Sequence, residues 1–363
     1  MNYLINHLKR IDWKLTVSAI LLSFIGLLQI YSISVGKHDF SSFYKQTGFI
    51  LIGILMMLFL SFFDWRGFRD NSYFILASYL FCIILLVGLL FVPEIRGIKG
   101  WYKIGPFSLD PIGITVIVLV ILLSKFFSNR HAEIYKIRHI ILSGIYTVIP
   151  FSLVAVQPNL GSALMLLAVW IGILTVSGIR IKHFLLLILL GIISVSLGWS
   201  FFLKEYQKDR IIGFLSPDTE ILGTNWSQTQ SKIAIGSGGI WGQGFAKGSQ
   251  TQNSFLTEPY TDFIFSSFAE EFGMLGIVTV VFIYLFLLWR ILKTALLAES
   301  NFPRIFALGL SVFIFFEAIV NIGMNLGVLP VIGIPMPLFS YGGSNLIAIF
   351  IGLGILQSIN SSK

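Results

Sequence analysis

The sequence predicts an all-α polytopic membrane protein with about ten transmembrane helices and one large extracytoplasmic loop between helices 7 and 8. Of its 363 residues, 56% are hydrophobic and only 12% are charged, far less charge than soluble domains carry. The apolar residues form stretches near the length of about 20 residues that crosses a bilayer, and such stretches are expected to be helices because lipid offers the backbone no hydrogen bonds. The stretches run 13–35, 46–63, 72–93, 111–128, 139–156, 160–178, 182–203, 263–290, 303–328 and 338–358.

Some of these elements need separate justification. The first stretch follows basic residues and is too long for the apolar core of a signal peptide, so it is interpreted as an uncleaved anchor. The fourth, 111–128, is the weakest candidate and would be short or tilted. The fifth and sixth are joined by a tight turn, 157–163, in which Asn159 can cap the following helix. The chain 1–363 is therefore interpreted as a single membrane domain.

The distribution of Lys and Arg predicts the orientation. With a cytoplasmic N-terminus, 15 of the 25 Lys and Arg residues fall inside and the other 10 outside, so both termini are predicted to be cytoplasmic. The outside basic residues gather in two loops, 94–110 and 204–262. An anionic substrate would account for basic residues placed against the positive-inside rule, and attraction to anionic lipid head groups is the alternative.

The segment 204–262 is the only extended polar region of the sequence, and any chemistry is expected there. Its glycines leave backbone N–H groups free to contact phosphate oxygens, although the strand and helix of a nucleotide-binding loop are missing. Asp262 stands just before the eighth apolar stretch. It could be a partner of the helix dipole or a general base at the lipid–water boundary, with Glu258 as the second acid within reach.

Three further acids, Glu270, Glu271 and Glu317, lie inside apolar stretches. Charges inside a membrane are costly, so such residues pair with Lys or Arg of a neighbouring helix or serve a function such as the proton relay of a transporter. The last outside loop, 327–345, contains three prolines and is expected to dip into the outer half of the bundle beside 204–262. No Cys/His cluster has the spacing of a structural metal site.

Four motifs stand out along the chain. They are QPNLGSA (157–163), SQTQSKIAIGSGGIWGQG (227–244), YTDFIFSSFAEEFGMLG (260–276) and LPVIGIPMPLFSYGGSN (329–345). Together they are similar to the SEDS family, the RodA and FtsW peptidoglycan glycosyltransferases, and the resemblance covers nearly the whole chain. The GIPMP run of 333–337 is more similar to RodA than to FtsW.

The resemblance implies an inverting glycosyltransferase that polymerises lipid II into glycan strands for cell elongation and shape, at the outer face of the bacterial cytoplasmic (inner) membrane. It implies Asp262 as the catalytic base. The implied partners are a class B penicillin-binding protein, the membrane, lipid II and an undecaprenyl-pyrophosphate-linked glycan, and no nucleic acid. A divalent cation, Mg²⁺ or Mn²⁺, could assist, but no dedicated metal site and no organic cofactor are expected. The expected substrate-binding residues are Trp101, Lys99, Lys204, Arg210, Gln230, Ser231, Lys232, Ser237, Glu258, Ser340, Tyr341, Gly342, Gly343 and Ser344.

The chain also departs from the family, and other functions are open at this point. An FtsW-like division polymerase, a lipid-linked precursor flippase or transporter built on the intramembrane acids, and a non-catalytic scaffold are the alternatives. The departures near Trp101 and at Asn159 bear on how the substrate is held. The departing positions are Gly100 in place of Arg, Asp110-Pro111-Ile112-Gly113 in place of QPSE, Asn159 in place of Asp, Tyr260 in place of His, and Glu317 in place of Gln.

Overall fold

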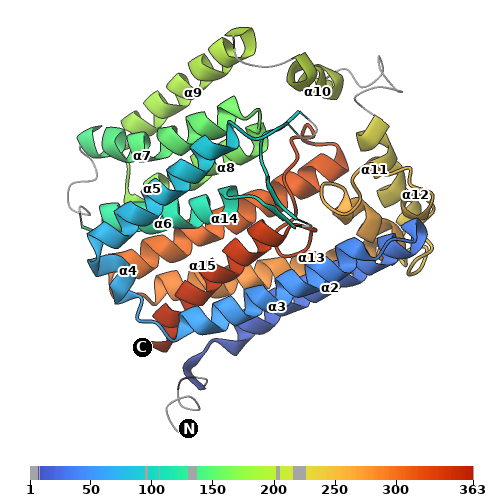
Figure 1. The fold of residues 1–363 in the computed structure, drawn as a ribbon, viewed down its shortest axis with the longest axis horizontal. Coiled ribbons are helices and arrows are strands. Elements are labelled where there is room, and N and C mark those ends of the chain that lie inside the picture. Colours follow the sequence, from blue (N-terminus) through green and yellow to red (C-terminus); the bar gives the residue numbers. More distant parts are fainter. Residues whose placement is uncertain are drawn as a thin grey trace.

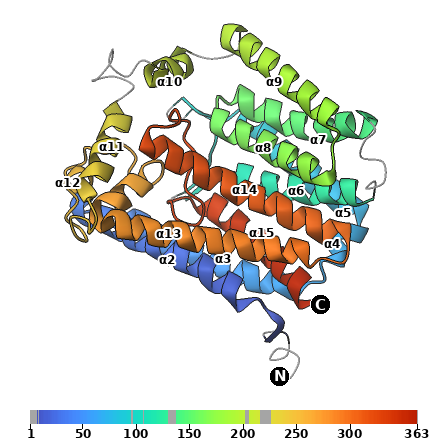
Figure 2. The same cartoon turned by 180° about the vertical axis from the view of Figure 1, so that it is seen from behind.

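The computed structural model describes residue 7 and residues 9–94, 97–105, 107–129, 137–201, 205–215 and 226–362. In both views the long helices lie side by side along one common direction, and α9 stands at the edge opposite α2 and α3 (Figures 1 and 2). Among the described residues, nine helices are long and apolar enough to cross a membrane. They are α2 (Trp13–Lys37), α3 (Ser41–Ser61), α5 (Ser72–Leu89), α7 (Ile137–Val156), α8 (Leu160–Ser177), α9 (Ile181–Phe201), α13 (Ile264–Leu296), α14 (Asn301–Leu326) and α15 (Gly343–Ser361).

A tenth apolar helix, α6 (Ile112–Ser128), has 17 residues and is the shortest of the set, as predicted for the fourth stretch. At about 1.5 Å per residue it is only about 25 Å long, against a hydrocarbon core of about 30 Å. Nearly all of its side chains are buried inside the protein. Because protein surrounds it, this helix does not have to match the thickness of the lipid. Among the described residues, nine helices of spanning length and this shorter apolar helix therefore stand at the ten predicted stretches.

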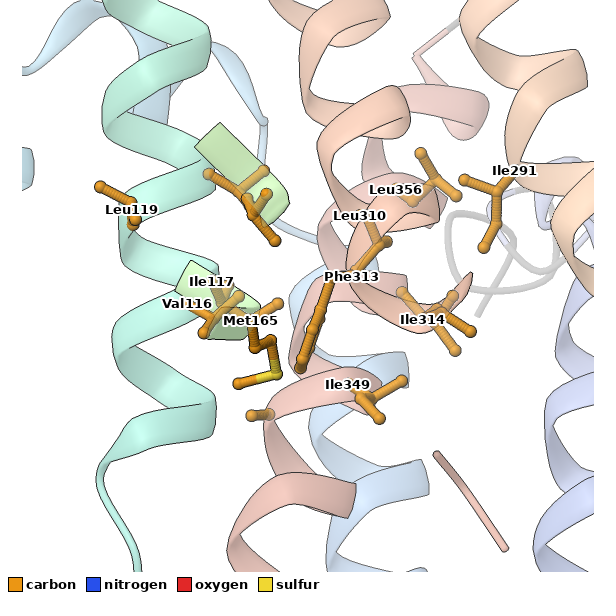
Figure 3. Close-up of a cluster of buried hydrophobic side chains, with 14 of the residues drawn as sticks. Val116, Ile117, Leu119, Met165, Ile291, Leu310, Phe313, Ile314, Ile349 and Leu356 are labelled. Atoms are coloured by element: carbon orange, nitrogen blue, oxygen red, sulfur yellow. The ribbon is translucent and has the colours of Figure 1, made fainter. Parts of the chain in front are cut away.

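The core of the bundle lies where α6, α14 and α15 meet. Val116 and Ile117 of α6 point toward Phe313 of α14 and Ile349 of α15, and all four side chains are at most 1% exposed (Figure 3). By contrast, the membrane-crossing part of α9 has no buried residue among those described. The apolar residues of α6 therefore face protein, whereas those of α9 are exposed in this chain.

The segments outside the long helices contain more regular structure than the sequence suggested. The loop 94–110 contains an antiparallel hairpin of two strands, β1 (Tyr102–Ile104) and β2 (Phe107–Leu109). The all-α prediction therefore holds for the bundle but not for this loop. The remaining short helices are α4 (Arg66–Asp70), α10 (Glu205–Leu215), α11 (Trp226–Gly238) and α12 (Ser249–Gln252), the last three within 204–262.

Helix α13 is interrupted near its start. Gly273 has φ 63° and ψ −162°, which lies outside the helical region and is accessible mainly to glycine. The break frees the carbonyls of Glu270 and Glu271, and these accept hydrogen bonds from the backbone N–H groups of Gln243 (2.9 Å) and Gly244 (3.1 Å). The loop between α11 and α12 therefore closes the break and fixes the first part of α13, which begins beside Asp262.

The segment 327–342 dips into the bundle, as the sequence predicted. Its central residues, including Met336 and Phe339, are buried. The backbone N–H of Tyr341 donates to the carbonyl of Tyr260 (2.8 Å), which joins this segment to the end of 204–262. Gly26 of α2 allows the close approach, because a Cβ at this position would lie 2.2 Å from the backbone oxygen of Phe339.

This contact predicts that Gly26→Ala destabilises the protein, since the added methyl group meets backbone that cannot rotate away. We expect a loss of about 1–3 kcal/mol in the free energy of unfolding, measured by denaturation in detergent. The matched control is Gly48→Ala in α3, where a Cβ would meet nothing within 4 Å. Equal stability of the two variants would contradict the packing described here.

Candidate functional site

Asp262 lies two residues before the first residue of α13 and is partly exposed. Its backbone carbonyl accepts hydrogen bonds from the side-chain amides of Asn321 (3.1 Å) and Asn325 (2.8 Å), both on α14. A Cβ placed on Gly333 would lie 3.7 Å from Oδ2 of Asp262, so the carboxylate reaches the segment 327–342. The backbone of the predicted base is thus held by α14, and its side chain lies beside the segment 327–342.

Asn321 and Asn325 are the site residues that sequence reasoning missed. Both are completely buried. Asn325 accepts from the backbone N–H of Ser266 (3.1 Å) and donates to the carbonyl of Asn321 (2.8 Å), while Asn321 donates to the carbonyl of Ile334 (2.8 Å). Two Asn residues four positions apart in an apolar span face the same side of a helix, and that spacing was the available signal.

The SYGGS motif, residues 340–344, contacts the two residues that precede Asp262. The Ser340 hydroxyl donates to the carbonyl of Thr261 (2.7 Å), and the backbone N–H of Gly342 donates to Oε1 of Gln46 (3.3 Å). Gly343 opens α15. With Tyr341 bound to Tyr260 as described above, the motif holds residues 260–261 through backbone contacts.

The predicted cations are found in different surroundings. Lys232 of α11 is exposed, and its Nζ lies 3.0 Å from the Cβ position of Gly327. Lys99 donates from Nζ to the carbonyl of Leu90 (3.1 Å), and Trp101 nearby is half-buried. The prediction at Lys204 lies outside the described residues. Arg210 falls within α10, but the position of its side chain is also outside the described part of the structure.

A further cation beside the site, Lys37, was not singled out by the sequence. It ends α2, and its Nζ lies 4.9 Å from the ring centroid of Tyr260, a cation–π contact. Tyr260 precedes Asp262 by two positions. Lys37 and Lys232 therefore place positive charge on two different elements at the end of the bundle that carries Asp262.

The remaining predicted residues contact protein in this structure. Ser231 is completely buried and donates to the carbonyl of Asn325 (2.7 Å), so α11 is bound to the same amide pair. Gln230 is also buried. The exposed Ser237 accepts from Nε2 of Gln243 (2.8 Å). The carbonyl of Glu258 accepts from two backbone N–H groups of the turn before α13.

The intramembrane acids accept hydrogen bonds from uncharged groups. Glu270 accepts from the backbone N–H groups of Gln250 (2.7 Å) and Thr251 (3.0 Å) at α12, and Glu271 accepts from the Ser32 hydroxyl (2.5 Å). Glu317 accepts from the side-chain amide of Asn345 (3.0 and 3.1 Å). No salt bridge within the described residues includes these acids, so the pairing with Lys or Arg that the sequence suggested is not found there.

Asp110 replaces a family glutamine and lies next to the last residue of the SYGGS motif. Its backbone N–H donates to the hydroxyl of Ser344 (2.9 Å), and its Oδ1 accepts from the backbone N–H of Ile112 (2.8 Å). Burial raises the pKa of the Asp110 carboxyl to about 6, against the opposing effect of the Ile112 hydrogen bond. Within the described part of the chain, no group of three or more His, Cys, Asp or Glu could hold a metal ion, so a divalent cation stays a prediction.

The sequence profile of a family described as cell cycle protein (FtsW, RodA and SpoVE) matches residues 12–363. The peptidoglycan glycosyltransferase MrdB of Escherichia coli K12 is 33% identical over 349 residues, which cover 96% of this chain and 93% of the relative. A chain of a peptidoglycan synthase complex that coordinates polymerization and crosslinking matches with TM-score 0.81 and 28% identity, over 97% of this chain and 98% of its own. The crystal structure of Thermus thermophilus RodA matches with TM-score 0.72 and 28% identity, over 96% of each chain.

The amide pair predicts a loss of stability in Asn325→Leu, a change of similar size without polar atoms. It would leave the buried N–H of Ser266 without a partner and remove one of the two amide donors to the carbonyl of Asp262. We expect the free energy of unfolding to fall by about 1–3 kcal/mol, measured by denaturation in detergent. Ile319→Leu on the exposed side of the same helix is the control. A variant Asn325→Leu as stable as the control would show that the amide is dispensable.

The Asp110 environment predicts a pH dependence. Because the folded-state pKa, about 6, exceeds the ordinary value of 3.8, folding favours the protonated carboxyl, and its contribution to stability is lost as pH rises from about 4 to about 6. We expect the melting temperature of the wild type, minus that of Asp110→Asn, to fall over this range. A difference that is constant or increases with pH would contradict the burial of this carboxyl.

Proposed function

The chain belongs to the cell cycle protein family of FtsW, RodA and SpoVE, and we propose that Asp262 is the general base of its polymerisation reaction. It is an integral protein of the bacterial inner membrane and a peptidoglycan glycosyltransferase. It assembles with a class B penicillin-binding protein that crosslinks the product, in agreement with the synthase complex that its fold matches. A RodA-like role in elongation is supported by the GIPMP run and by its similarity to MrdB and RodA.

The reaction joins two lipid-linked sugars. Asp262 takes the proton from the 4-hydroxyl of the acceptor N-acetylglucosamine, and the resulting oxygen attacks the anomeric carbon of the donor strand and inverts it. The observation that supports this role is the way the residue is held. The backbone of Asp262 is fixed by two buried amides, while its carboxylate stays at the partly exposed end of the bundle. A general base works only when its geometry is fixed in this manner.

The leaving group is undecaprenyl pyrophosphate, which departs as an anion and needs positive charge more than a proton. Lys232 is the predicted cation that the described structure leaves exposed, whereas Lys99 is bonded to a backbone carbonyl. Lys37 adds a cation beside Tyr260. The roles of Lys204 and Arg210 stay predictions. A bound divalent cation would supply the same neutralisation.

The active site is proposed to face the extracytoplasmic side, with both termini in the cytoplasm. The two ends of the chain lie at the same end of the bundle, since the backbone N–H of Asp12 donates to Oε1 of Gln357 near the end of α15 (2.9 Å). This end also carries Arg290 and Lys293 at the end of α13, which agrees with the positive-inside rule. Asp262 lies at the opposite end.

The test is polymerisation of lipid II by the purified protein, alone and with its co-purified class B partner. We expect Asp262→Asn to lower the rate by about 10²–10⁴-fold, the usual contribution of a general base. Asp39→Asn is the matched control, because Asp39 is an exposed acid at the same end of the bundle whose side chain accepts from the backbone N–H and the hydroxyl of Ser41. A folded Asp262→Asn enzyme that polymerises as fast as the wild type would overturn the proposed role.

A further inference from the structure

A groove of about 500 Å³ opens between α2 and α13, at the end of the bundle opposite Asp262. Trp13 and Lys14 line its mouth, and Val17 and Leu21 continue along the same face of α2, opposite Phe282 and Phe286 of α13. Apart from Lys14, these wall residues are apolar or aromatic. Ser18 also lines the groove, but its hydroxyl donates to the carbonyl of Leu15 (2.8 Å). Any preference of the groove for a charged ligand must therefore come from Lys14, the charged residue that lines it.

The length of the groove indicates the kind of molecule that fits it. Residues 13 to 21 of α2 cover eight steps of about 1.5 Å, or about 12 Å along the helix axis. Half of a hydrocarbon core of about 30 Å is about 15 Å. The groove thus extends from the membrane surface to a depth of about one leaflet. A lipid acyl chain has this reach, whereas a transmembrane helix of a partner would need a groove through both leaflets.

The charges at the mouth favour a negative head group. Lys14 is exposed and has no ion-pair partner among the described residues. The neighbouring acid, Asp12, is already neutralised, because Oδ2 accepts from Nε of Arg290 at 3.0 Å, and the two side chains are only 10% and 15% exposed. Lys293, one turn further along α13, lies 5.6 Å above the ring of Trp289. The balance of charge around the mouth is therefore positive.

We propose that this groove binds a phospholipid with a net negative head group, whose phosphate contacts Lys14 and whose acyl chain lies along Val17, Leu21 and Phe282. The lipid would bridge α2 and α13 beside the Asp12–Arg290 pair. Trp13, at the mouth, is placed at head-group level, where amphipathic aromatic rings are favoured. The proposal concerns the end of the bundle away from Asp262 and does not depend on the role of that residue.

The experiment measures lipid binding by native mass spectrometry of the full chain in detergent. Phosphatidylglycerol and phosphatidylcholine with identical acyl chains are the probes. We expect the wild type to bind phosphatidylglycerol about fivefold more tightly, the effect of about one basic residue at the membrane surface. Lys14→Gln should remove this preference. Lys182→Gln, which changes an exposed lysine near the start of α9 and outside the groove, should keep it.

A second variant tests the apolar part of the groove. Val17→Trp fills it and should weaken binding of both lipids, and a melting temperature equal to that of the wild type would establish that the variant is folded. If Val17→Trp does not fold, Lys14→Gln still tests the proposal, because Lys14 is exposed and its substitution is not expected to disturb the fold. Equal binding of the two lipids by the wild type, or an unchanged preference in Lys14→Gln, would overturn the proposal and leave the groove to another occupant such as a helix of a partner protein.

Discussion

The hydrogen bonds from Asn321 and Asn325 to the carbonyl of Asp262 are the interaction on which the end of the bundle around Asp262 depends. The first backbone groups of a helix lack partners within the helix itself, and in the membrane interior no water replaces them. Asn325 supplies such a partner by accepting from the N–H of Ser266, both amides hold the carbonyl of Asp262, and the pair also binds Ile334 and, through Ser231, α11. Four segments distant in sequence thus share one buried polar centre.

The acids within the spans follow the same principle. Glu270 and Glu271 are at most 1% exposed, yet their oxygens accept hydrogen bonds from α12 and from Ser32 of α2. They act as acceptors that attach the loop between α11 and α13 to the bundle. This arrangement explains the acids without a proton path, and it fits a protein whose chemistry takes place at the surface of the membrane and not across it.

The apolar pattern was enough to predict ten helices, because lipid leaves the backbone few other solutions. The entry of the segment 327–342 into the bundle could also be predicted, because its prolines disfavour a regular membrane-spanning helix. The proposed role of Asp262 rests on the family resemblance, and the structure adds how its backbone is held. The partners of Asn325, Lys37 and Glu271 could not be predicted, since they depend on which helices pack together. The hairpin at 102–109 was missed because its strands have only three residues each.

The break at Gly273 divides α13 into two mechanical parts. Residues 270 and 271 before the break and residues 274 and 275 after it are all hydrogen-bonded to the loop 239–244, and Arg290 near the far end of the helix pairs with Asp12. A continuous helix would pass any tilt of its inner part directly to its first turn. With the hydrogen-bond ladder interrupted, the loop 239–244 replaces the missing helical bonds, so the position of Asp262 depends on this loop as well as on the rest of α13.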